Sequence, residues 1–187
     1  MDRTDPPQPL VRWTSALEQA TVLDRAVQAV KPTVTAAFGT GRRGSVLRGD
    51  WLGHAVHPVL TDLVVGTWTS ASVLDLLGGR GSSEAAQKLI GTGLLAAGPT
   101  AWTGWAEWSV TGQREQRVGV VHAATNAVAI GVYAASWVAR KRGRHSTGAR
   151  LALVGTAVSG LGAYLGGHLA VARDVGSHHP FYDETAP

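Results

Sequence analysis

The stretch VGVVHAATNAVAIGVYAASWVA, residues 118–139, decides the fold class. It carries no formal charge and a single histidine, His122. The hydrocarbon core of a bilayer is roughly 30 Å thick, and a helix needs about 20 residues to cross it. The stretch has that length, and polar segments containing arginine bound it on both sides. It therefore predicts a membrane-spanning helix.

Three further runs share this character: residues 58–77, 89–106 and 151–172. Their only formal charges are Asp62 and Asp75, both in the first run. The short polar connectors make consecutive helices antiparallel neighbours. The sequence thus predicts an all-α fold, a four-helix transmembrane bundle with up-down-up-down topology, over residues 54–175. A soluble all-α protein is the alternative, but a chain of 187 residues is too short to bury four helices that are apolar all round.

The ends of the chain are predicted to lie outside this bundle. Residues 1–53 form an N-terminal amphipathic or interfacial segment. Within it, apolar positions recur at helical spacing over residues 14–30, which predicts an amphipathic surface helix that starts at Thr14 or Ser15 and is closed by Pro32. We expect this helix at the membrane surface or on the end of the bundle. Residues 176–187 are predicted to be a flexible C-terminal tail.

Composition limits the chemistry that the chain can perform. It has no cysteine, which excludes disulfides, cysteine-ligated iron–sulfur clusters and thiolate zinc sites, so any metal would bind histidine and carboxylate. Lys and Arg number 17 against 13 Asp and Glu, for a net charge of +4. The basic residues lie in short loops between apolar runs, a pattern that indicates membrane topology and not nucleic-acid binding.

The histidines of the apolar runs are predicted to gather at one membrane face. Because the helices alternate in direction, the starts of the first and third runs and the ends of the second and fourth lie on the same side. The polar residues that this places together are His54, His57, Asp62, Glu107, His122, Asn126, Tyr164 and His168. His122 and His168 lie at matched depth, each five residues from a flanking arginine. An ionisable side chain within a span indicates a functional site.

Three hypotheses follow for this cluster. In the first, His122 and His168 ligate haem b for electron transfer, with His57, Asn126 and Tyr164 beside the cofactor. In the second, a transition-metal ion (Zn, Cu or Fe) binds a non-haem set drawn from the cluster. The residues of that set are His54, His57, Asp62, Glu107, His122 and His168. In the third, the chain is a non-catalytic membrane anchor or assembly subunit, and the polar cluster only ties its helices together.

Four motifs, in this order, resemble the DUF2231 family of predicted bacterial four-helix membrane proteins, in particular its actinobacterial branch: WLGHAVHPVLTDLVVGTW, TGWAEWS, RVGVVHAATNAVAIGVY and GAYLGGHLAVARDVG. Members of that branch commonly continue into a Rieske iron–sulfur domain, and other relatives are joined to cytochrome c modules. The resemblance implies an electron-transfer setting without specifying a reaction. The positions that match are His54, His57, Asp62, His122, Asn126 and His168.

The resemblance and the apolar runs together set the expected location and partners. We expect a multi-pass protein of the bacterial cytoplasmic membrane, in contact with lipid and not with nucleic acid. This chain has no Cys-x-His pair, so we expect any Rieske or cytochrome partner to be a separate polypeptide. A homo-oligomer is also compatible with the pattern.

Overall fold

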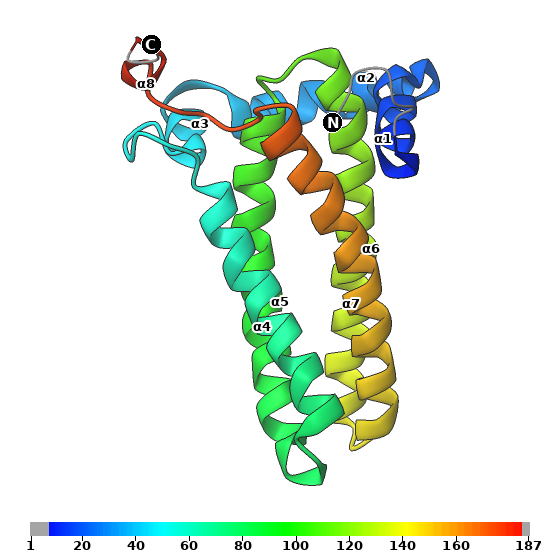
Figure 1. The fold of residues 1–187 in the computed structure, drawn as a ribbon. Helices are drawn as coiled ribbons and strands as arrows, with labels where there is room; N and C mark the ends of the chain where they lie inside the picture. Colours follow the sequence, from blue (N-terminus) through cyan, green and yellow to red (C-terminus); the bar gives the residue numbers. More distant parts are fainter. Residues whose placement is uncertain (1–7, 185–187) are drawn as a thin grey trace.

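The computed structural model describes residues 8–184, and within them the chain is helical, as the sequence predicts. Each of the four apolar runs lies in one long helix (Figure 1). These helices are α4 (His57–Leu77), α5 (Ser83–Trp108), α6 (Gln113–Lys141) and α7 (His145–Gly167). A wider π-helical turn, His168–Ala172, continues α7.

Three of the described helices are long and apolar enough to cross a membrane: α4, α6 and α7 with its π-helical turn. The fourth long helix, α5, is not among them. The C-terminal half of α5 contains Pro99 and is rich in glycine, threonine and tryptophan, which have low hydropathy. The helix nevertheless continues past Pro99 without a break. The predicted all-α fold is therefore confirmed, and three of the four long helices have the properties of a membrane span.

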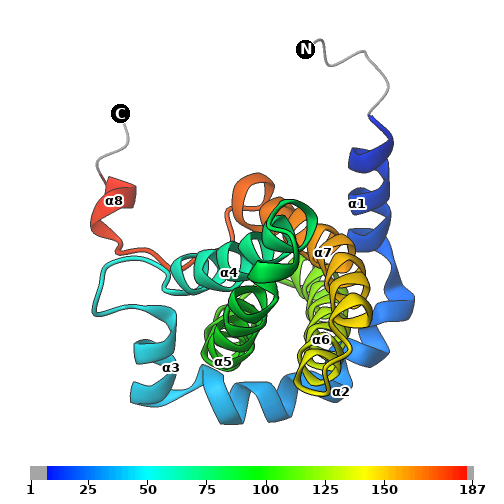
Figure 2. The same ribbon diagram turned by 90° about the horizontal axis from the view of Figure 1, so that it is seen from below.

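The long helices form two antiparallel hairpins, α4–α5 and α6–α7, that pack side by side (Figures 1 and 2). Small residues let them approach closely: Ala71, Ala86 and Ala152 are fully buried in the core between them. Two larger side chains meet at its centre. The rings of Trp68 and Tyr133 stack with their centroids 4.0 Å apart.

The N-terminal segment wraps around the α5 and α6 side of one end of the bundle, which we call the belt end (Figure 2). Helices α1 (Pro9–Gln19), α2 (Asp24–Val34) and α3 (Gly41–Arg48) follow one another around α6 and α5 (Figure 2). The prediction of one helix over residues 14–30 is wrong, because the chain turns at Ala20 and starts a second helix.

The predicted start and stop signals of that helix also proved wrong. Helix α1 begins at Pro9, a residue suited to a first helical turn because it has no N–H to leave unpaired. Thr14 is buried inside α1, and its hydroxyl donates to the carbonyl groups of Leu10 and Val11 instead of capping. Pro32 lies inside α2, and the chain continues beyond it into a π-helical turn over Thr35–Gly39.

Candidate functional site

A cavity of about 310 Å³ lies between the two hairpins, toward the belt end. This volume is at the lower end of the range for small-molecule pockets. Its wall is mainly alanine, glycine and the indole rings of Trp68, Trp105 and Trp108. The polar groups that interrupt it include His57, Glu107, His122 and Asn126. Among the described side chains, none of those lining the cavity belongs to a lysine or arginine.

His57, the first residue of α4, is held in one orientation by α5. Its Nδ1 donates to the Thr100 carbonyl at 2.9 Å, and the Thr103 hydroxyl lies 3.3 Å away. A carbonyl oxygen can only accept, so Nδ1 carries the proton of the neutral ring and Nε2 carries a lone pair. The ring lies against Gly104, where an added Cβ would come within 2.8 Å of its Cε1 atom.

His122 of α6 repeats this arrangement against α7. Its Nδ1 donates to the Gly162 carbonyl at 2.9 Å, and its ring lies against Gly166, where a Cβ would come 3.0 Å from Cε1. Its Nε2 therefore also carries a lone pair, which accepts a hydrogen bond from the Asn126 amide at 3.0 Å. Two histidines from different hairpins thus present hydrogen-bond acceptors at one apolar cavity.

Glu107 adds a carboxyl group near the end of α5. The side chain is buried, with 6% exposed. Its Oε2 accepts from the backbone N–H and the hydroxyl of Ser177, at 3.0 and 2.8 Å. Its Oε1 is buried and has no hydrogen-bond partner in the described structure. A buried polar atom left unpaired costs free energy, so Oε1 is suited to bind a hydrogen-bond donor brought by a ligand or by water.

His168, predicted to pair with His122, instead contacts the N-terminal segment. Its Nε2 donates to Glu18 at 2.7 Å, and Arg173 donates to both oxygens of the same carboxylate. Burial raises the pKa of Glu18, but the hydrogen bonds from Arg173 and His168 and the charge of Arg173 outweigh it and leave the pKa below its ordinary value. His168 does not line the cavity. The structure therefore brings His122 together with His57 and uses His168 to fasten α1.

The other predicted site residues lie apart from the cavity. Tyr164 stacks on Trp13 of α1 with ring centroids 5.9 Å apart. Asp62 is exposed on α4. His54 is exposed and pairs through its backbone with His178, where the C-terminal segment passes. Within residues 8–184, no three histidine or carboxylate side chains lie close enough to hold a metal ion, so the structure provides no ligand set for the predicted non-haem site.

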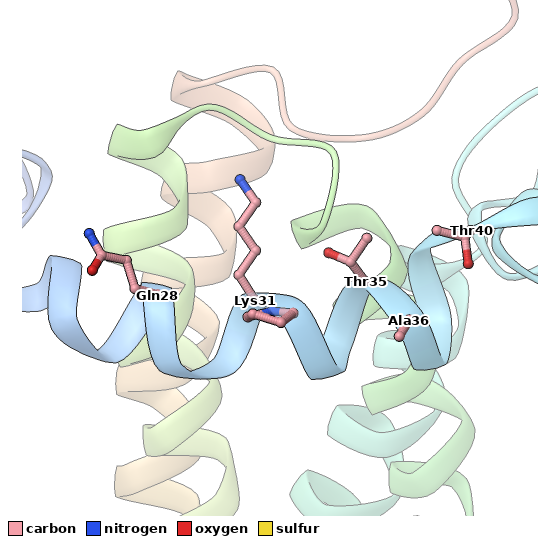
Figure 3. A pocket seen from close by; sticks show the side chains of 6 residues that line it. Gln28, Lys31, Thr35, Ala36 and Thr40 are labelled. Atoms are coloured by element: carbon pink, nitrogen blue, oxygen red, sulfur yellow. The ribbon is translucent and has the colours of Figure 1, made fainter.

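A second hollow, along the outer side of α2, has a different character. It is an open depression lined by a single stretch of chain, as Figure 3 shows for Gln28, Lys31, Thr35, Ala36 and Thr40. Lys31 reaches across to donate to the Gln116 side chain at 3.2 Å. Its polar groups do not converge on an enclosed space, so the cavity between the hairpins is the better candidate.

An all-helical bundle with three helices able to cross a membrane and a ligand-sized cavity defines a helical membrane protein. The family of predicted membrane proteins designated DUF2231 matches residues 53–179, and the chain belongs to that family. No curated protein and no solved structure matches the chain. The matched region includes His57, Glu107 and His122, whereas α1 and α2 lie outside it.

The sequence places His57 and His122 in one cluster but pairs His122 with His168, whereas the structure brings His57 and His122 to the cavity and leaves His168 outside it. The equal depth of His122 and His168 in their helices does not determine how each helix is rotated about its axis, and this rotation decides which side chains meet. The sequence does contain a sign that His57 and His122 are related, because a glycine follows each of them at the same spacing, Gly66 and Gly131.

Proposed function

We propose that the chain is a four-span integral membrane protein of the bacterial cytoplasmic membrane. Helix α5 packs between α4 and α6, two candidate spans to which short loops join it. A helix in that position crosses wherever its neighbours cross. Its low hydropathy is tolerated because Gly93, Ala97 and Thr100 are buried against other helices and not exposed to lipid. Helices α1 and α2 lie at the membrane surface at the belt end.

The function that the geometry supports best is binding of a neutral, ring-shaped redox compound from the membrane. The observation that carries this proposal is that His57 and His122 line one apolar cavity with Nδ1 fixed as the donor, which leaves Nε2 of each ring as the acceptor. At His122 the ligand displaces the Asn126 amide from that acceptor. Indole rings beside them offer flat apolar surface to an aromatic ring. The resemblance to proteins joined to Rieske and cytochrome modules supports an electron-transfer role, with a separate iron–sulfur or cytochrome protein as the electron acceptor.

Haem b between His57 and His122 is the second candidate. One observation favours it: a histidine whose Nδ1–H is fixed by a carbonyl presents Nε2 as an axial ligand would. The charge of the cavity does not fit, because haem carries two propionates and no described lysine or arginine lines the wall. The His122–His168 pair fits less well, since Nε2 of His168 is bound to Glu18.

Purification in mild detergent, followed by a reduced-minus-oxidised visible spectrum and solvent extraction, tests both candidates. We expect no haem band and an extractable lipophilic compound whose ultraviolet spectrum changes on reduction. A haem band that disappears in His57→Ala and His122→Ala would establish the second candidate. Protein that yields neither, and whose tryptophan fluorescence no added ring compound changes, would contradict ligand binding and favour the anchor-subunit hypothesis.

A further inference from the structure

The two hairpins repeat one another in sequence. His57, Gly66, Trp68 and Asp75 of α4 lie 65 residues before His122, Gly131, Tyr133 and Arg140 of α6. Residues of α5 correspond in the same way to residues of α7 that lie 62 positions later. The matching pairs are Gly93 and Gly155, Gly98 and Gly160, Ala101 and Ala163, and Gly104 and Gly166. Six of these eight pairs are identical, and their constant register along both helices of each hairpin indicates an internal duplication.

The structure supports this duplication through contacts between related positions. Trp68 stacks on Tyr133, and Asp75 forms an ion pair with Arg140. Residues related by a two-fold axis touch only where they lie beside that axis. The axis therefore runs along the bundle between α4 and α6, an arrangement known for parallel repeats in membrane proteins.

Local packing repeats as well. The Trp68 ring covers Gly93 and the Tyr133 ring covers Gly155; a Cβ on either glycine would come within 2.8 Å of the covering ring. Toward the belt end, His57 donates to Thr100 and covers Gly104, and His122 donates to Gly162 and covers Gly166. The two histidines therefore occupy related half-sites on opposite sides of the axis, which differ in that Asn126 donates to Nε2 of His122.

From this symmetry we infer that the ligand is a lipid-soluble hydroquinone, an inference that rests on the proposed function. A hydroquinone is neutral, its ring is apolar, and its two hydroxyl donors stand on opposite sides of that ring. One hydroxyl donates to Nε2 of His57 and the other to Nε2 of His122, where it replaces the Asn126 amide. A phenol satisfies only one half-site, and a carboxylate has no cation to bind in the cavity.

Binding titrations with the detergent-purified protein test the inference, read by quenching of tryptophan fluorescence. The probes are an alkyl hydroquinone, its monomethyl ether and its dimethyl ether, which differ only in the number of donors. Each hydrogen bond lost weakens binding by about tenfold. In His57→Ala or His122→Ala, the hydroquinone should bind only as well as its monomethyl ether binds the wild type.

Glycine variants provide a test that keeps both histidines. Gly104→Ala and Gly166→Ala push the His57 and His122 rings aside, and should weaken hydroquinone binding by about tenfold. Gly98→Ala and Gly160→Ala are matched controls in the same helices, because a Cβ at either position meets no atom within 4 Å. The controls should bind as the wild type does.

The outcomes separate the two levels of the proposal. If the dimethyl ether binds the wild type as tightly as the hydroquinone, the cavity is a ligand site but its ligand is not a hydroquinone. If the Gly104 and Gly166 variants bind like their controls, the histidines do not hold the hydroxyls. If none of the three ring compounds binds, the proposed function itself fails.

Discussion

Exchange of the buried ion pair between the hairpins tests the internal duplication directly. Arg140 donates to Asp75 through both terminal nitrogens, and the two side chains are 0% and 6% exposed. Removing one partner of a buried pair leaves a charge without a counter-charge, at a cost of about 3–5 kcal/mol. We therefore expect Asp75→Asn, which keeps the size of the side chain, to lower the free energy of unfolding by about that amount.

The duplication predicts what the exchanged variant D75R/R140D will do. The Arg140 side chain lies over Gly148, where a Cβ would come within 2.5 Å of its Cγ atom. In the duplicated half, residue 75 corresponds to Arg140 and Ala86 corresponds to Gly148. Ala86 is fully buried and is the residue over which a side chain at position 75 is expected to lie. The exchange should recover part of the loss, because the pair is restored but the new arginine meets the Ala86 methyl group.

Ala86→Gly should then change sign with its background. In the wild type it costs about 1–2 kcal/mol, since glycine weakens a helix interior and the buried methyl group of Ala86 is lost. In D75R/R140D it removes the clash and should raise stability. Unfolding in mixed detergent micelles, followed by far-ultraviolet circular dichroism, compares the wild type, Asp75→Asn, D75R/R140D and Ala86→Gly in both backgrounds. If Ala86→Gly is destabilising to the same extent in both backgrounds, the two ends of the pair are not equivalent and the duplication argument fails.

Two further predictions concern α1 and the core. The pKa of Glu18 lies below its ordinary value of 4.5, so its ion pair with Arg173 stabilises the fold in full above about pH 4.5. This stabilisation is lost as the pH falls through the lowered pKa. Proteolysis of the N-terminal segment should accelerate only in this acidic range, and Glu18→Gln should abolish the pH dependence. Trp68→Ala removes a 5%-exposed ring stacked on Tyr133 and should destabilise the protein by about 3–5 kcal/mol. Trp51 is 69% exposed, so Trp51→Ala should change the stability by no more than about 0.5 kcal/mol. Unfolding of the two variants in micelles compares these losses.

The sequence was sufficient for those features that depend on position along the chain. Length and apolarity placed α4, α5, α6 and α7, and alternation of direction placed His57, Glu107, His122 and His168 toward one end. Which side chains meet there depends on how each helix is rotated about its axis. The rotation of α7 is fixed partly by Glu18, which binds His168 and Arg173 from a helix distant in sequence. No local pattern around His168 contains that information.

The turn at Ala20 likewise depends on a contact with a part of the chain that is distant in sequence. Residues 14–30 have the periodicity of one helix, yet Arg117 donates to the Glu18 carbonyl at 2.8 Å and to the Asp24 carboxylate. One arginine of α6 thus binds the end of α1 and the start of α2, and draws the chain around the bundle. Its hydrogen bonds lower the pKa of Asp24, because they stabilise the charged carboxylate.

The differences between the duplicated halves indicate how a symmetric site can hold a ligand in one direction. Close packing of related residues, Trp68 on Tyr133 and Asp75 on Arg140, fills the axis over part of the bundle, and the cavity lies toward the belt end. There the halves are alike in histidine, carbonyl and glycine, but differ in what surrounds them. Asn126 corresponds to Thr61, and Glu107 to Leu169. Because Glu107 has an unpaired buried oxygen and its counterpart Leu169 has an apolar side chain, the α5 side of the cavity carries a hydrogen-bond acceptor that the α7 side lacks.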